Sequence, residues 1–262
     1  QLLNSQQLLD WAREDGSTAA LLSAHRARVF DLLAAADLPA VDAEILAFRR
    51  IAEPLRAPAY LWWLSTWSTM RTLLEGRLDD AETEAIATYE LGKGPLDGLA
   101  ITNLSFLLFF LRREQGRLDE MESATRSYAA DQADVPAIRV ALTFLLAETG
   151  KLEEARVLLS AITAGGFEQL RDRNWPATWF QLARAAALLG DATSARALLA
   201  SSTRPTEQCV MVSLATVCLG STSLAAAWLL HAIGDLDAAD AEFRIAEDVN
   251  ARLGARSWLA QT

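Results

Sequence analysis

The sequence repeats a short turn pattern at a nearly regular interval. Residues Leu73–Glu82 read LLEGRLDDAE, and similar stretches follow, each with glycine, an apolar residue two positions later and usually a small residue five positions later. The anchors of the pattern, including one weaker copy at an alanine, are Ala36, Gly76, Gly116, Gly150, Gly190 and Gly234. Neighbouring anchors lie 34 to 44 residues apart. An internal period of this size indicates a stack of supersecondary units.

Each anchor separates two segments with helical periodicity. Before Gly76, the apolar residues Tyr60, Trp63 and Trp67 recur at steps of three and four, as on one face of a helix. Glycine suits the turn between two helices because it adopts positive φ easily at a helix C-terminus. The small residue after the turn, such as Ala81, allows the two helices to approach closely. Each unit is therefore predicted to be a helix, a tight turn and a second helix.

The predicted helices cover most of the chain. The first helices of the units are expected at 17–35, 57–75, 97–115, 134–149, 174–189 and 219–233. The second helices are expected at 38–52, 78–92, 118–130, 152–164, 191–202 and 236–250. Segment 2–14 resembles a second helix without its partner, and segment 255–262 resembles a first helix cut short, so we expect a piece of a longer protein.

These elements predict an all-α fold: a right-handed α-solenoid of antiparallel helix pairs, with about six units in a single domain over residues 1–262. No part of the chain predicts a sheet. The mostly apolar segment 203–220 is longer than a turn between units requires, and we expect a short extra helix or a flap there.

Composition and charge exclude several classes of protein. The net charge is −10, which opposes nucleic-acid binding because affinity for phosphates depends on Lys and Arg. No apolar stretch approaches the length of about 20 residues that spans a membrane, and no signal peptide is present, so we expect a cytoplasmic protein that does not contact a membrane. Cys209 and Cys218 are too few for a disulfide framework and lie in no metal-binding motif, so we expect two reduced thiols.

No catalytic motif is present. His25 and His231 lie in the first and last full units, so local polar contacts are expected rather than a catalytic pair. Acidic residues such as Asp79 and Asp80 follow the turns, where they stabilise the positive end of the next helix without acid–base chemistry. We therefore expect no enzyme, no metal and no cofactor.

The turn pattern resembles the tetratricopeptide repeat, although the period of about 40 exceeds the usual 34, and Val41 and Met121 replace the small residue in two units. A further resemblance covers most of the chain. FLLFFLRREQGRLDE, NWPATWFQLARAAALLGD, VCLGS and NARLGARSWLAQT resemble the repeat region of large bacterial STAND-type ATPase regulators, either MalT-like proteins of the LuxR family or proteins fused to a class III nucleotide cyclase. This resemblance implies a sensor or interaction segment in signal transduction, whose partners are a protein or the ATPase and output domains of the same chain.

The resemblance to tetratricopeptide repeats also marks the residues that face the concave groove. The set is largely aromatic with a few polar side chains: Arg26, Phe30, Trp63, Thr66, Met70, Asn103, Phe106, Phe110, Arg113, Phe144, Phe180, Arg184 and His231. Such a groove fits a hydrophobic small molecule, or an amphipathic segment, oriented by arginine towards an anion. Trp62 and Trp63 point about 100° apart on a helix, so one is expected between helices and the other in the groove.

Three alternatives remain at this point. In the first, the aromatic residues line a ligand groove in a sensor domain, with segment 203–220 as a lid. In the second, the groove holds only a protein segment, as in a pure protein–protein interaction scaffold. In the third, the solenoid is tightly wound and the aromatic side chains pack against neighbouring helices as core.

Overall fold

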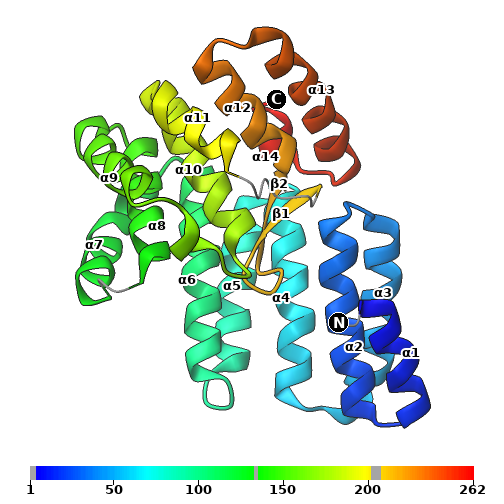
Figure 1. The fold of residues 1–262 in the computed structure, drawn as a ribbon. Coiled ribbons are helices and arrows are strands. Elements are labelled where there is room, and N and C mark those ends of the chain that lie inside the picture. The colour runs from blue at the N-terminus through cyan, green and yellow to red at the C-terminus, as the bar shows by residue number, and fades with distance from the viewer. Residues whose placement is uncertain (1–3, 133–134, 202–207) are drawn as a thin grey trace.

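The computed structural model describes residues 4–132, 135–201 and 208–262 (Figure 1). Within these ranges the chain is a series of helices with one small sheet. The helices are α1 (Ser5–Asp15), α2 (Thr18–Ala34), α3 (Leu38–Leu55), α4 (Pro58–Leu74), α5 (Leu78–Gly92), α6 (Asp97–Glu114), α7 (Glu122–Asp131), α8 (Pro136–Glu148), α9 (Leu152–Ala164), α10 (Trp175–Leu189), α11 (Ala192–Ala200), α12 (Thr222–Ile233), α13 (Leu236–Arg252) and α14 (Arg256–Leu259), with two short 3₁₀ helices, η1 (Leu118–Met121) and η2 (Glu168–Leu170).

The predicted all-α solenoid is confirmed. Six consecutive helix pairs, from α2/α3 to α12/α13, follow one another in the described residues, and α8, α10 and α12 pack side by side (Figure 1). The anchor glycines lie in the left-handed region, with φ between 60° at Gly190 and 84° at Gly234. Ala36 adopts φ of 55° at the equivalent turn, where a non-glycine residue costs about 1–2 kcal/mol.

The small residue after each turn is buried, as expected for closely approaching helices. Ala81, Ala155, Ala195 and Ala239 are at most 2 % exposed. The third unit differs, because Met121 replaces alanine there. The chain forms η1 before α7 begins at Glu122, and no residue of α7 is fully buried.

The prediction that no sheet occurs is wrong. Strands β1 (Cys209–Val212) and β2 (Val217–Ser221) form an antiparallel hairpin in the segment expected to be a short helix or flap, and α12 begins at Thr222 rather than at 219. Valine and threonine favour strands, but a short apolar run alone does not distinguish a buried strand from a helix. The hairpin turn contains Ser213 and Ala215 with φ of 55° and 62°. Positions 203–207 of the predicted segment lie outside the described residues.

The hairpin occupies the inner side of the solenoid. Strand β1 packs against α2 and α10, and β2 packs against α4, α6, α12, α13 and α14 (Figure 1). All nine strand residues are buried. Asn103 of α6 donates a hydrogen bond from Nδ2 to Oγ1 of Thr216 over 3.0 Å, and the Trp258 indole of α14 donates to the Cys218 carbonyl over 3.3 Å. The hairpin is therefore part of the hydrophobic core between the helices that it contacts.

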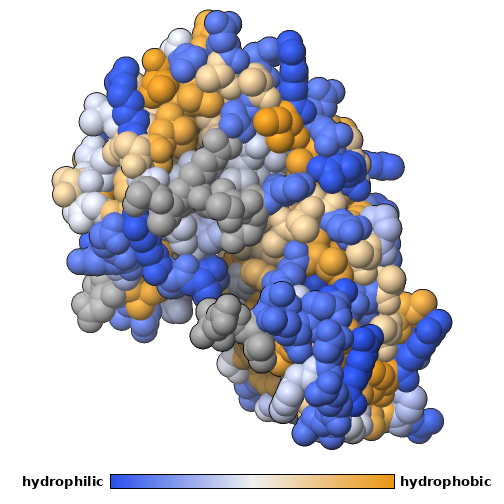
Figure 2. All heavy atoms as spheres, turned by 45° about the vertical axis from the view of Figure 1, so that its right-hand side comes forward, coloured by the Kyte–Doolittle hydropathy of each residue, from blue (hydrophilic) through white to orange (hydrophobic). Residues whose placement is uncertain are grey.

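Polar side chains cover most of the face shown in Figure 2, and apolar side chains appear there in scattered groups. Among the described residues, no helix is long and apolar enough to cross a membrane.

Candidate functional site: a pocket between two helices and the hairpin turn

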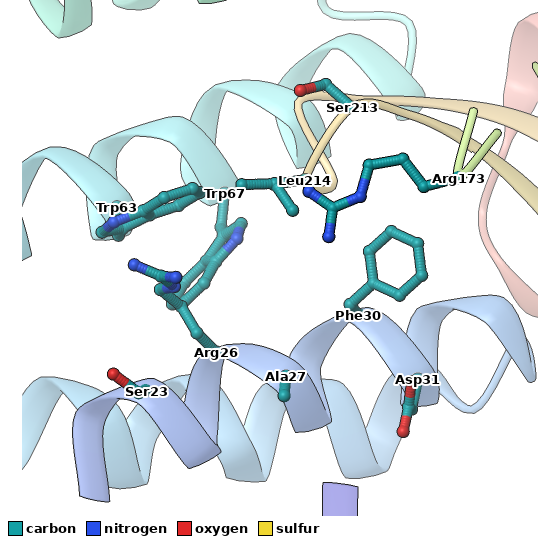
Figure 3. Close-up of a pocket in the computed structure, with 10 residues that line it drawn as sticks. All are labelled: Ser23, Arg26, Ala27, Phe30, Asp31, Trp63, Trp67, Arg173, Ser213 and Leu214. Carbon is teal, nitrogen blue, oxygen red and sulfur yellow. The ribbon is translucent and has the colours of Figure 1, made fainter. Parts of the chain in front are cut away.

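A cavity of about 340 Å³ lies between α2, α4 and the hairpin turn (Figure 3). Helix α2 supplies one wall and α4 the opposite wall. The lining residues are Ser23, Arg26, Ala27, Phe30, Asp31, Trp63, Trp67, Arg173, Ser213 and Leu214. Helical spacing explains the two walls, because side chains three or four residues apart share one face. Ser213 and Leu214 come from the turn between β1 and β2, and Arg173 precedes α10, so four separate segments form the pocket.

Arg26 is the central polar group of the pocket. Its guanidinium carbon lies 4.5 Å from the centroid of the Trp63 ring, within the range of a cation–π interaction. Burial lowers the pKa of Arg26, and Tyr60 acts in the opposite direction. Arginine nevertheless stays charged in proteins. In the described part of the chain Arg26 forms no ion pair, so its charge is half-buried against aromatic rings without an acidic partner.

A second arginine reaches the same cavity. Figure 3 shows the Arg173 guanidinium between Leu214 and Phe30, on the side opposite Arg26. Arg173 has no acidic partner within residues 4–132, 135–201 and 208–262. Asp31 also lines the pocket, but its carboxylate points away from the cavity in Figure 3, and it forms no ion pair with either arginine. The pocket is thus a locally positive site in an acidic protein.

The apolar part of the lining has a nearly buried side and a more exposed side. Trp63 is 5 % exposed and Trp67 is 1 % exposed, so their rings form a nearly buried wall. Phe30 and Leu214 are only half-buried. Phe30 and Leu214 therefore present the more accessible apolar surface of the cavity.

The structure brings together three of the predicted groove residues, Arg26, Phe30 and Trp63. Most of the others are buried under the hairpin or between helices, as the third alternative predicted for them: Thr66, Met70, Asn103, Phe110, Phe144 and Phe180 are at most 3 % exposed. Phe106 is partly buried against the same core. Most of the predicted groove residues outside the pocket are therefore part of the core, packed against neighbouring helices or against the hairpin.

The other two predicted arginines are neutralised within the fold. Arg113 and Arg184 both bind Oε1 of Glu148, at 3.0 Å and 2.8 Å. Arg113 also lies over the Trp258 ring, 4.5 Å from its centroid. These arginines therefore hold helices together rather than offering a charge to a ligand.

The histidines lie outside the pocket. His25 is buried, and its Nδ1 lies 2.7 Å from Oε1 of Glu44, which confirms a local polar contact. His231 is exposed on α12. Among the described residues there is no group of three or more His, Cys, Asp or Glu that could hold a metal ion.

Other pocket residues were not predicted as part of the groove, among them Trp67, Arg173, Ser213 and Leu214. Trp67 follows Trp63 by one helical turn, so periodicity alone was a sufficient signal for it. Ser213 and Leu214 reach the pocket because the hairpin packs against α2 and α10, and Arg173 reaches it from the segment that precedes α10.

No family model, curated protein or solved structure matches this chain.

Proposed function

We propose that this chain is a sensor repeat domain of a larger bacterial regulator, and that it binds a small organic anion with an apolar ring in the pocket between α2, α4 and the hairpin turn. The observation that carries this proposal is Arg26, a half-buried charge stacked on Trp63 without an acidic partner in the described residues. Buried charges are normally paired, and an anionic ligand would supply the missing partner.

The composition of the pocket supports the same ligand class. Ligand sites are typically concave and mainly apolar, with a few polar groups that set orientation. Here Phe30, Leu214 and the two tryptophans provide the apolar surface, and Arg26 and Arg173 provide two charges. A cavity of about 340 Å³ accommodates a molecule with one or two rings rather than a protein segment.

The regulatory context rests on the resemblance of FLLFFLRREQGRLDE and the related motifs to the repeat regions of STAND-type ATPase regulators. In such a protein, ligand binding would alter how the repeats pack on an ATPase or output domain. The hairpin is suited to that role, because its turn contacts the pocket while its strands contact helices from both halves of the solenoid.

A protein–protein scaffold without a small-molecule ligand is the second candidate. The observation that favours it is apolar exposure on the second helices of several units. Ile86, Tyr128, Val157 and Ile245 are between 51 % and 70 % exposed, on α5, α7, α9 and α13. A partner would then bind these outer helices rather than the filled concave side.

Isothermal titration calorimetry tests the first proposal with two probes of the same ring system, 1-naphthoate and the uncharged 1-naphthalenemethanol. We expect 1-naphthoate to bind at least about tenfold more tightly, because a hydrogen bond to a charged group contributes roughly 1.5–3 kcal/mol. Arg26→Gln should reduce this preference, because only Arg173 then remains to pair with the carboxylate. Arg13→Gln, which changes an exposed arginine of α1, is the matched control and should bind as the wild type does. Equal binding of the two probes to the wild type would overturn the proposal and favour the scaffold.

A further inference from the structure

The two cysteines face each other across the hairpin. Cys209 of β1 and Cys218 of β2 have their Sγ atoms 3.0 Å apart. A disulfide bond is about 2.05 Å long, so the sulfurs lie within roughly 1 Å of bonding distance. Both side chains are buried, at 1 % and 4 % exposure.

The two cysteines lie on adjacent strands but are not directly paired in the strand register. Met211 pairs with Cys218, and in a regular ladder Cys209 would be the diagonal neighbour of Cys218 on the same face. The pairing is irregular between Cys209 and Met211, so that Cys209 lies opposite Ser221. Irregularities of this kind redirect a side chain locally. The two thiols therefore meet next to a local irregularity of the hairpin.

We infer that Cys209 and Cys218 form a redox pair that closes into an intramolecular disulfide by exchange with a low-molecular-weight disulfide. In the first step the Cys218 thiolate attacks one sulfur of the small disulfide, which forms a mixed disulfide and releases one thiolate. In the second step the Cys209 thiolate, after losing its proton to solvent, attacks Sγ of Cys218 and releases the second thiol. Two protein thiols are oxidised and one small disulfide is reduced to two thiols.

The environment of the pair supports this order of attack. The hydrogen bond from the Cys209 thiol lowers the pKa of Cys218, and the backbone at Gly220 and the positive charge of Arg71 act in the same direction, against the effect of burial. The same hydrogen bond, together with burial, raises the pKa of Cys209. Cys218 is thus the better nucleophile for the first step. Because both sulfurs are buried, exchange requires local opening of the hairpin.

The new bond would close a short loop that contains the hairpin turn. Ser213 and Leu214, which line the pocket, lie within this loop. Oxidation would therefore fix the turn in place, whether or not the pocket binds an anion.

A redox titration of the folded protein tests the inference. The chain is equilibrated in buffers with varied ratios of oxidised to reduced glutathione, starting from both the reduced and the oxidised protein. It is then acid-quenched, alkylated and analysed by mass spectrometry. We expect the ratio of disulfide to dithiol to be at least tenfold higher in the folded chain than in the same chain unfolded in guanidinium, because the fold holds the sulfurs together.

Cys209→Ser and Cys218→Ser are the controls, and each should show at most one glutathione adduct and no intramolecular bond. If either variant fails to fold, the comparison between the folded and unfolded wild-type chain still tests whether the fold favours the disulfide. An equal or lower ratio in the folded chain, or a glutathione adduct on each cysteine without an internal bond, would overturn the inference.

Discussion

Gly92, the last residue of α5, tests how tightly the wall behind the pocket is packed. An added Cβ at this position would lie 2.7 Å from Cδ1 and Nε1 of Trp62 and 2.8 Å from Cβ of Ala100, whereas ordinary contacts begin at 3.4 Å. Trp62 is 1 % exposed, and its ring lies 4.9 Å from that of Trp63 in a T-shaped arrangement. The ring therefore has little space into which it can move.

Gly92→Ala should consequently destabilise the protein, although alanine is the better helix former. Overpacking a core costs about 1–3 kcal/mol, and the gain in helix propensity offsets at most about 1 kcal/mol of that cost. We expect a net loss of roughly 1–2 kcal/mol. For a chain of this size this loss corresponds to a decrease in Tm of roughly 3–6 °C, measured by circular dichroism.

Gly98→Ala is the matched control for this prediction. Gly98 lies in the first turn of α6, and nothing is within 4 Å of its added Cβ. We expect the control to leave Tm unchanged or to raise it slightly. A Gly92→Ala variant that melts at or above the wild-type temperature would refute the packing argument for Trp62.

Three further predictions concern other contacts. Arg112 lowers the pKa of Glu82 to about 2, so the ion pair stabilises the fold fully above the pKa of the unfolded chain and less and less as the pH falls towards 2. Because the Glu82 side chain is 29 % exposed, Glu82→Gln should lower the free energy of unfolding by only about 1 kcal/mol at pH 7. A difference between variant and wild type in urea unfolding that does not shrink at low pH would contradict this. Ala155→Leu should destabilise by about 1–3 kcal/mol, since Ala155 is fully buried at a close helix contact, and an unchanged Tm would disprove this packing. Asn103→Leu leaves the Thr216 hydroxyl unpaired at a cost of about 1–3 kcal/mol and should accelerate amide hydrogen exchange in the hairpin; equal exchange rates would show that this bond does not hold the hairpin.

The repeat architecture was predictable because its signals are local. Gly76 and its equivalents adopt the positive φ that the turn pattern predicts, and Ala155 is buried where a small residue was expected. Trp62 and Trp63 diverge as helical geometry requires, with Trp62 against Gly92 and Trp63 in the pocket.

The contents of the concave side were not predictable, because they depend on distant contacts. An apolar run such as Cys209–Val212 is compatible with both strand and helix. In the structure it is a strand that pairs with β2 and is buried against α2 and α10. Arg113 had the same sequence signal as Arg26, yet Glu148, 35 residues away, neutralises it. Whether an arginine is paired is thus decided by tertiary structure.

The location of a bound anion is the most direct test of the proposed sensor site. The measurement is a crystal structure of the chain with 1-naphthoate at a concentration that saturates binding in solution. We expect the carboxylate between Arg26 and Arg173, with the ring against Phe30 and Leu214. An empty pocket under these conditions, or a ring bound only elsewhere on the chain, would contradict the assignment of this pocket as the ligand site.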